Sequence, residues 1–229
     1  MTLRGIGQTT SSLNYLERMQ EAMAYNIANS NTDAFKAVHM AAHSAEEDGR
    51  SRSFERIDFR QGALARTDRP FDLALEGEGF FVVRTESGER LTRGGSFQLD
   101  SQGRLVDAHG ASLLAEEGEV VITGENVRVQ PDGAIYIDGA PAGKLRVETV
   151  ADPNTLVREE SGRFVAPDCT RPVEEGATQV RQGATEGSNL DPMLALVDML
   201  TIERAYSANL QALRTMDGVL GAINDAGRV

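Results

Sequence analysis

Cysteine and lysine are almost absent from the 229-residue sequence, and tryptophan is absent altogether. The single cysteine, Cys169, excludes an intramolecular disulfide bond and a cysteine-based zinc site. Only 23 basic residues accompany 35 acidic ones, so the formal net charge is −12. A chain this acidic lacks the basic surface that binding to nucleic acids or anionic membranes requires. We therefore expect no nucleic-acid partner.

Long apolar runs are also missing. The best candidate, Met193 to Val197, ends at Asp198 and is far shorter than the roughly 20 residues of a membrane-spanning helix. The first ten residues contain no apolar segment of the kind that a cleavable secretory signal carries. The sequence thus predicts neither direct membrane insertion nor a cleavable signal.

A metal site finds little support. His39 and His43 are four residues apart, a spacing that would place both imidazoles on one face of a helix. The zinc-protease motif needs a glutamate directly after the first histidine, and Met40 stands there. Glu46 or Glu47 could supply a third ligand, but acidic residues are common in this chain. We interpret the two histidines as surface residues and expect no metal.

Catalytic and cofactor motifs are missing as well. His109 lies in a predicted turn, with no nucleophile and supporting acid near it in the sequence. The Gly77-Glu78-Gly79 triplet lacks the third glycine of a dinucleotide-binding loop, and a strand pattern follows it where a helix would be needed. No Gly-x-Ser-x-Gly or Walker-type motif occurs. We expect no catalytic residue, no cofactor and no enzyme activity.

Glycine is distributed unevenly along the chain. Thirteen of the 23 glycines lie between Gly77 and Gly162, whereas residues 8–48 and 191–217 contain none. Glycine-free ends around a glycine-rich middle predict helices at both ends and a sheet between them. The fold class is therefore α+β.

The C-terminal end carries the strongest helical pattern. A seam of positions spaced three and four apart is apolar at every position except Asn209, over more than three heptads, as in a coiled coil. Asp191 followed by Pro192 is a suitable helix start, because proline fits the first helical position and aspartate accepts from free N–H groups. The seam consists of Met199, Ile202, Tyr206, Asn209, Leu213, Met216, Leu220 and Ile223.

The N-terminal end shows a weaker version of this pattern, with Gln20 as its polar position. The helix starts near Asn14, which could form a capping pair with Glu17, or earlier, near Ile6. We expect it to end within residues 29–33, whose short polar side chains favour turns. Its apolar seam positions are Leu13, Leu16, Met23 and Ile27.

The middle of the chain reads as short antiparallel strands. Residues 96–100, 127–130 and 145–148 alternate polar and apolar, and glycines recur every six to nine residues. Phe80 to Val83 is continuously apolar and should be the most buried strand, and further strands are expected around Phe164 and Val180. We divide the chain into an N-terminal helix at 1–36, a linker or extended arm at 37–60, a β-rich domain at 61–186 and a C-terminal helix at 187–229.

Three blocks of residues resemble the bacterial flagellar rod and hook axial protein family. The first block is Asn26 to Lys36. The second extends from Gln61 through Phe80-Phe81 to Phe97 and continues from Asp100 to Val106. The third is Gly187 to Asn209. They occur in the family's order and cover most of the chain except residues 39–60 and roughly 108–181. The residues that carry the resemblance are Asn26, Asn29, Asn31, Thr32, Phe35, Lys36, Asp72, Gly77, Gly79, Phe80, Phe81, Arg93, Gly95, Phe97, Gly187, Asn189, Arg204 and Ala205.

Two features distinguish this chain within the family pattern. The family usually has glycine directly before the Phe-Lys pair, and here that residue is Ala34. If the position needs a positive φ, alanine is strained there and the local turn could differ. The segment between Lys36 and Gly62 is only 25 residues long, which favours a proximal-rod over a distal-rod type of subunit.

The resemblance implies a structural subunit of the flagellar basal-body rod. In such proteins the terminal helices pair as a coiled-coil domain lining an axial tube, with a β-rich domain outside it. The implied partners are further copies of the chain, other rod and hook axial proteins, and the flagellar type III export apparatus. The implied location is the periplasmic rod, reached without a cleavable signal. The alternative is a secreted β-domain that binds cell-wall polysaccharide, which would need an aromatic platform that 5% aromatic residues make hard to build.

The physical hypothesis concerns the two ends of the chain. An isolated amphipathic helix is only marginally stable in water. The free energy gained by burying its apolar side chains is smaller than the entropic cost of ordering its backbone. We therefore expect the terminal segments to be largely disordered before assembly and to become helical on incorporation into a polymer. Asn209, as the polar residue of the seam, is expected to fix its register.

Overall fold

The computed structural model describes residues 2–44, 51–166 and 170–226. The chain forms two compact units. The helical unit comprises residues 1–29, 38–57 and 190–229, and the β unit comprises residues 30–37 and 58–189. Helices at both ends and short strands between them confirm the predicted α+β class.

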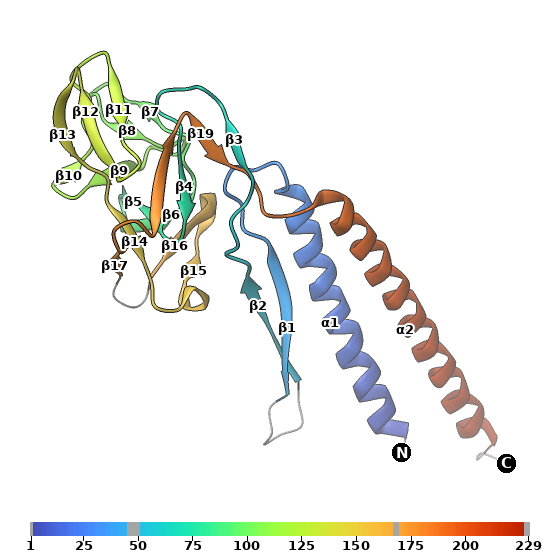
Figure 1. The fold of residues 1–229 in the computed structure, drawn as a ribbon. Helices are drawn as coiled ribbons and strands as arrows, with labels where there is room; N and C mark the ends of the chain where they lie inside the picture. Colours follow the sequence, from blue (N-terminus) through green and yellow to red (C-terminus); the bar gives the residue numbers. More distant parts are fainter. Residues whose placement is uncertain (1, 45–50, 167–169, 227–229) are drawn as a thin grey trace. The chain divides into compact units, whose positions relative to one another are not determined.

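The helical unit is built on two long helices, α1 (Thr2–Ala28) and α2 (Pro192–Ala226). The two helices contact each other, and Figure 1 shows them side by side. The predicted start of α2 is confirmed, because the Asp191 carboxylate accepts from the Met193 and Leu194 N–H groups at 2.9 and 3.2 Å. No described helix is long and apolar enough to span a bilayer.

Helix α1 begins at Thr2, earlier than both predicted starts, so it is longer than expected. It ends at Ala28, and a turn through residues 29–34 follows, as predicted. Asn29 closes the last turn through its side-chain amide, which donates to the Tyr25 carbonyl at 2.9 Å. Short polar side chains thus compete with the helical backbone where the helix ends.

Strands β1 (Val38–Ser44) and β2 (Ser51–Ile57) form an antiparallel hairpin in the helical unit. The hairpin lies against α1, with the Tyr15 hydroxyl 3.4 Å from the Met40 carbonyl and the Arg18 guanidinium 3.1 Å from the Ser53 hydroxyl. The segment interpreted as a linker or extended arm therefore contains regular structure. His39 and His43 lie on β1 and not on a helix, so the helical spacing considered for them was wrong.

The β unit contains all remaining strands, and every pairing between them is antiparallel. The main sheet has the order β15-β16-β6-β5-β9-β8-β7, with β10 on β9 and β14 between β5 and β17. Smaller sheets are β11-β12-β13, β18-β4 and β19-β3. The strands are β3 (Leu64–Arg66), β4 (Leu73–Gly77), β5 (Phe80–Thr85), β6 (Gly88–Thr92), β7 (Gln98–Leu99), β8 (Leu105–Val106), β9 (Ser112–Ala115), β10 (Gly118–Glu119), β11 (Val127–Val129), β12 (Ala134–Ile137), β13 (Ala140–Lys144), β14 (Val147–Thr149), β15 (Val157–Arg158), β16 (Arg163–Val165), β17 (Arg171–Pro172), β18 (Thr178–Gln182) and β19 (Ala184–Glu186).

Strand β5 is the centre of the hydrophobic core. Its first four residues, Phe80 to Val83, are all buried, as predicted from their continuous apolar run. Phe81 packs edge-on against Phe97, with ring centroids 5.9 Å apart. The strands expected around Phe164 and Val180 are β16 and β18. Strand β18 pairs with β4, so residues more than 100 positions apart in the sequence complete one small sheet.

The Gly77-Glu78-Gly79 triplet is the turn between β4 and β5, as predicted. Both glycines have positive φ, +118° and +109°. A Cβ atom on Gly77 would lie 2.5 Å from the Ala177 carbonyl oxygen, and one on Gly79 would lie 2.7 Å from Val173 Cγ2. Conformation and close packing therefore both require glycine at this turn.

Candidate functional site

The first and third family blocks meet in the β unit at a site that we call the buried junction, formed by residues 34–37, 60–62, Arg93 and 186–189. The Ala34 N–H donates to the Glu186 carbonyl at 2.6 Å, and the Asn189 N–H donates to the Phe35 carbonyl at 3.2 Å. The Asn189 side chain accepts from the Ala37 N–H at 2.9 Å. Two segments about 150 residues apart in sequence are thus joined along their backbones.

Glu186 is the centre of the buried junction. Its Oε1 atom accepts from Lys36 Nζ at 2.6 Å and from the Gly62 N–H at 2.9 Å, and its Oε2 atom accepts from Arg93 Nε at 2.8 Å. The side chains of Lys36 and Glu186 are 1% and 0% exposed, and that of Arg93 is 5% exposed. A charge removed this completely from water is tolerated only when it is paired and hydrogen-bonded.

The two cations of the junction also bind backbone carbonyls. Lys36 Nζ donates to the Arg60 carbonyl at 2.8 Å. Arg93 donates to the carbonyls of Gly77 at 2.9 Å and Gly79 at 2.7 Å. The glycine turn that begins the central strand is therefore fixed to the same ion cluster as the two chain segments.

The cluster holds two positive charges and one negative charge. Burial lowers the pKa of the Lys36 ammonium below its ordinary value, and the adjacent Glu186 carboxylate opposes this shift. Arg93 adds a like charge that lowers the Lys36 pKa further. The single carboxylate is consequently the group on which both cations depend.

Arg158 closes one side of the junction. Its guanidinium donates to the Lys36 carbonyl and lies over the Phe35 ring, 5.1 Å from the ring centroid. It also lies 5.8 Å from the ring of Phe164 on β16. A planar, always-charged guanidinium suits such stacking, which lysine would not provide.

Two asparagines of the family motif form, through their side-chain amides, the backbone hydrogen bonds that a neighbouring strand would otherwise form. In the helical unit, Asn26 is fully buried, donates to the Val38 carbonyl at 2.7 Å and accepts from the Val38 N–H at 2.8 Å. In the β unit, the Asn189 amide donates to the carbonyls of Asp58 at 2.7 Å and Arg60 at 3.0 Å. A side-chain amide can satisfy one donor and one acceptor together, which explains asparagine at both positions.

Ala34 occupies the left-handed region, with φ +56°, and it is buried. The position where the family usually has glycine therefore keeps a positive φ in this chain, with alanine in it. The turn does not change to suit the side chain, and its backbone is strained instead.

The other motif residues stabilise the β unit or lie outside its core, on its surface or on α2. Asp72 is buried, and its carboxylate accepts from Arg69 Nε at 2.7 Å and from the Ser96 hydroxyl at 3.4 Å. Gly95 has no room for a side chain, since a Cβ atom would lie 1.6 Å from the Leu73 carbonyl oxygen. The motif residues Asn31, Thr32 and Arg204 are exposed, and Ala205 and Gly187 are half-buried.

The seam positions on α1 and α2 are mostly half-buried. Ile202 is buried and Met216 is 40% exposed, whereas the side chain of Ile223 lies outside the described residues. The remaining seam residues, Leu13, Leu16, Met23, Ile27, Met199, Tyr206, Asn209, Leu213 and Leu220, are intermediate. The Asn209 side chain donates to the Ala205 carbonyl of its own helix at 2.9 Å.

Beside the seam, the first three turns of α2 carry a second apolar surface, which we call the α2 patch. Its five large side chains are 48–76% exposed in the described structure. They are Met193, Leu194, Leu196, Val197 and Leu200. Soluble proteins seldom leave so many neighbouring apolar side chains exposed without a partner for them.

Sequence reasoning missed both the α2 patch and the central role of Glu186. The patch was overlooked because the seam used only every third or fourth position of the helix. Glu186 directly precedes the motif residue Gly187, but an acidic residue beside a turn gives no signal of burial. In the part of the chain that the structure describes, no group of three or more His, Cys, Asp or Glu residues could hold a metal ion.

Comparison with known proteins gives consistent matches. Two family models match, the flagellar hook protein FlgE/F/G D1 domain over residues 74–137 and the flagellar basal body rod FlgEFG protein C-terminal over residues 181–226. Arg93 falls in the first matched segment, and Glu186 and Asn189 fall in the second.

Individual relatives match over most of the chain. The flagellar basal-body rod protein FlgF of Caulobacter vibrioides is 29% identical, over 84% of this chain and 85% of its own length. FlgF of Salmonella typhimurium is 28% identical, over 96% and 94%. The flagellar basal-body rod protein FlgG of Buchnera aphidicola is 32% identical, over 73% and 69%.

Proposed function

Because the chain belongs to the flagellar basal-body rod protein family, as a structural rod subunit and not an enzyme, we propose that it polymerises through its terminal helices into the axial shaft of the basal body. The observation that carries the proposal is the α2 patch. Its five exposed side chains lie outside the seam positions predicted for helix pairing, so they are available to a neighbouring subunit.

The energetics favour association through this surface. Full burial of a large aliphatic side chain is worth roughly 1.5–3 kcal/mol. Five such side chains, each about half exposed or more, leave several kcal/mol of hydrophobic free energy unused in the single chain. Contact between copies would recover this free energy. The half-buried seam supports the same proposal, since a neighbouring helix would complete its burial.

We assign the subunit to the proximal rod. Support comes from the match to FlgF proteins over nearly the whole chain and from the short segment between Lys36 and Gly62. Its partners in this proposal are further copies of itself and other rod and hook axial proteins. The flagellar export apparatus would deliver it to the periplasmic rod without a cleavable signal.

The polysaccharide-binding alternative gains no support from the structure. Such a module would present aromatic side chains on its sheet. The large exposed aromatic side chains among the described residues are Tyr25 and Phe54, and both belong to the helical unit.

The test places a charge in each apolar surface of α2. Leu196→Asp alters the α2 patch, and Leu213→Asp alters the seam. We expect each variant to lose assembly, because a carboxylate would have to be buried without a partner in the polymer. Assembly is measured by pelleting of concentrated protein with negative-stain imaging, and by the presence of rods in isolated basal bodies.

Gln211→Asp, at an exposed polar position of the same helix, is the matched control and should assemble normally. The β unit should remain folded in all three variants, and circular dichroism of each variant checks this. Normal assembly of Leu196→Asp would mean that the α2 patch is not an assembly surface.

A further inference from the structure

The β1-β2 hairpin has one covered face and one open face. Register places Val38 opposite Ile57 and Met40 opposite Glu55 on the face that lies against α1, and Val38 is buried. The alternate pairs, His39 with Arg56 and Ala41 with Phe54, share the opposite face. We call this the hairpin's outer face. It exposes half of the Phe54 side chain, together with Arg56 and His39.

This composition is typical of a protein-binding surface. Aromatic residues and arginine are enriched at the energetically important positions of interfaces, because they combine a large apolar area with a directed polar group. A two-stranded ribbon has little core of its own, so the exposed half of a phenylalanine side chain on it adds little to the stability of the fold. A partner for the outer face would need an apolar surface opposite Phe54 and an acidic surface opposite the exposed Arg56.

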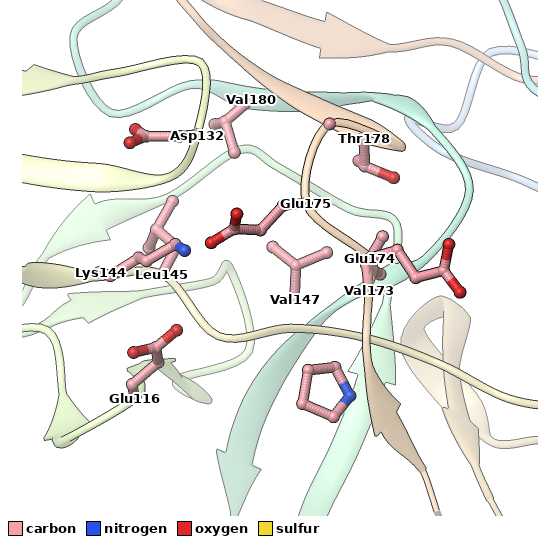
Figure 2. A pocket seen from close by; sticks show the side chains of 12 residues that line it. Glu116, Asp132, Lys144, Leu145, Val147, Val173, Glu174, Glu175, Thr178 and Val180 are labelled. Carbon is pink, nitrogen blue, oxygen red and sulfur yellow. The ribbon is translucent and has the colours of Figure 1, made fainter.

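The β unit carries a hollow with these properties. It has a volume of about 280 Å³ and lies between Lys144 at the end of β13, β14, β17 and the turn of residues 173–178. Leu145, Val147 and Val180 contribute its apolar floor. Figure 2 shows the Glu175 side chain turned into the hollow, whereas the Glu174 carboxylate points away from it.

The rim of the hollow is acidic. The carboxylates of Glu116 and Glu175 form no ion pair or hydrogen bond with any residue that the structure describes, and both side chains are exposed. Asp132 adds a third carboxylate, and Lys144 is the cation of the lining. The β unit as a whole has 24 acidic and 15 basic residues, a net charge of −9. On the outer face of the hairpin, the positive charge of Arg56 matches the acidic rim, and the apolar Phe54 ring matches the apolar floor.

We propose that the outer face of the hairpin of one copy docks into this hollow on the β unit of a second copy, with Phe54 on the apolar floor and Arg56 paired with Glu175. The inference rests on the proposed function, because it names one contact of the polymer. The two surfaces differ, so the contact is head-to-tail and repeats from copy to copy, as a growing shaft requires. It is separate from the α2 patch.

Charge reversal in the full-length chain tests the pairing. Arg56→Glu and Glu175→Arg should each weaken association by about tenfold or more, because each places like charges together. The double variant should recover to within about threefold of the parent, since the pair is restored with reversed polarity. Association is measured by sedimentation velocity. Arg128→Glu and Glu125→Arg, both exposed and outside the hollow, are the matched controls and should change association little.

Disulfide cross-linking identifies the two molecules involved. Phe54→Cys and Glu175→Cys are made in separate chains that also carry Cys169→Ser. Mixed chains should give a covalent dimer on oxidation, and Phe54→Cys mixed with Val157→Cys should not. Failure of the double charge variant to recover, or absence of the mixed dimer, overturns the inference. If Leu196→Asp abolishes assembly while both charge reversals are silent, only the hairpin contact fails; if all three are silent, the proposed function fails too.

Discussion

Glu186 organises the residues around it more than any other single side chain in the β unit. It accepts from two buried cations and from the Gly62 N–H, so it joins three parts of the sequence at one point. Removal of one of the two cations therefore has a different effect from removal of the Glu186 carboxylate. Removing Lys36 leaves a balanced Arg93–Glu186 pair, whereas removing Glu186 leaves two buried positive charges without a counter-ion.

This asymmetry gives a prediction for stability. Glu186→Ala should lower the free energy of unfolding by about 3–5 kcal/mol, the cost of leaving buried charge unpaired. Lys36→Met should cost clearly less, because the remaining pair is neutral overall. Urea denaturation monitored by circular dichroism measures both, with Glu186→Gln used if the alanine variant does not fold.

Glu76→Ala is the control, because Glu76 pairs with Arg181 at 2.6 Å on the surface, where both side chains are about half exposed. It should cost no more than about 1 kcal/mol. Equal losses for Glu186→Ala and Lys36→Met would show that the carboxylate is not the centre of the cluster.

At the residue scale, sequence reasoning identified the motif members but not their partners. Lys36, Arg93 and Asn189 were selected by resemblance, and the structure brings them to one junction. Glu186 was not selected, because its role depends on contacts with residues 150 and 93 positions away. Long-range ion pairs leave no local pattern in a sequence, whereas turn glycines such as Gly77 and Gly79 do.

Helices and strands could largely be predicted where the sequence pattern that specifies them lies within a short segment. Helix α2 begins at the predicted Asp191-Pro192 pair, and β5 is the buried strand that its apolar run indicated. The β1-β2 hairpin was not predicted, since its outer face mixes histidine, arginine and phenylalanine and does not alternate between apolar and polar residues. Its structure depends on α1, which covers one face.

The turn that follows α1 carries a testable strain. Ala34 has φ +56°, which costs alanine about 1–2 kcal/mol relative to a right-handed conformation. Ala34→Gly should therefore raise the free energy of unfolding by about 0.5–1 kcal/mol, after allowance for the loss of a buried methyl group and for the greater freedom of glycine in the unfolded chain. The measurement is the midpoint of urea unfolding.

Ala37→Gly is the matched control, because Ala37 is equally buried but does not have positive φ. It should lower stability by about 1 kcal/mol. If both substitutions destabilise the protein to a similar extent, the turn at Ala34 is not strained.

At the scale of the whole molecule, the two units differ in how fully their apolar side chains are buried. The β unit has a continuous buried core and a fully paired ion cluster. The helical unit has two paired helices, but it leaves the α2 patch exposed and most seam positions half-buried. Both chain ends are helical in this single chain, and the hypothesis that they gain their full order only in a polymer stays a prediction.

A physical reason explains why the sequence alone does not determine how much of each helix forms before assembly. An amphipathic pattern specifies which face of a helix is buried, but not whether the partner is in the same chain or in another. Leu13 and Leu213 fit either case.

Amide hydrogen exchange of residues 193–200, compared between the purified monomer and the assembled polymer, tests this account most directly. We expect these amides to exchange at least about 100-fold faster in the monomer, because an incompletely buried helix opens at low free-energy cost, while amides of β5 exchange at equal rates in both states. Equal and strong protection of residues 193–200 in the monomer and the polymer would contradict the claim that α2 is completed by neighbouring subunits.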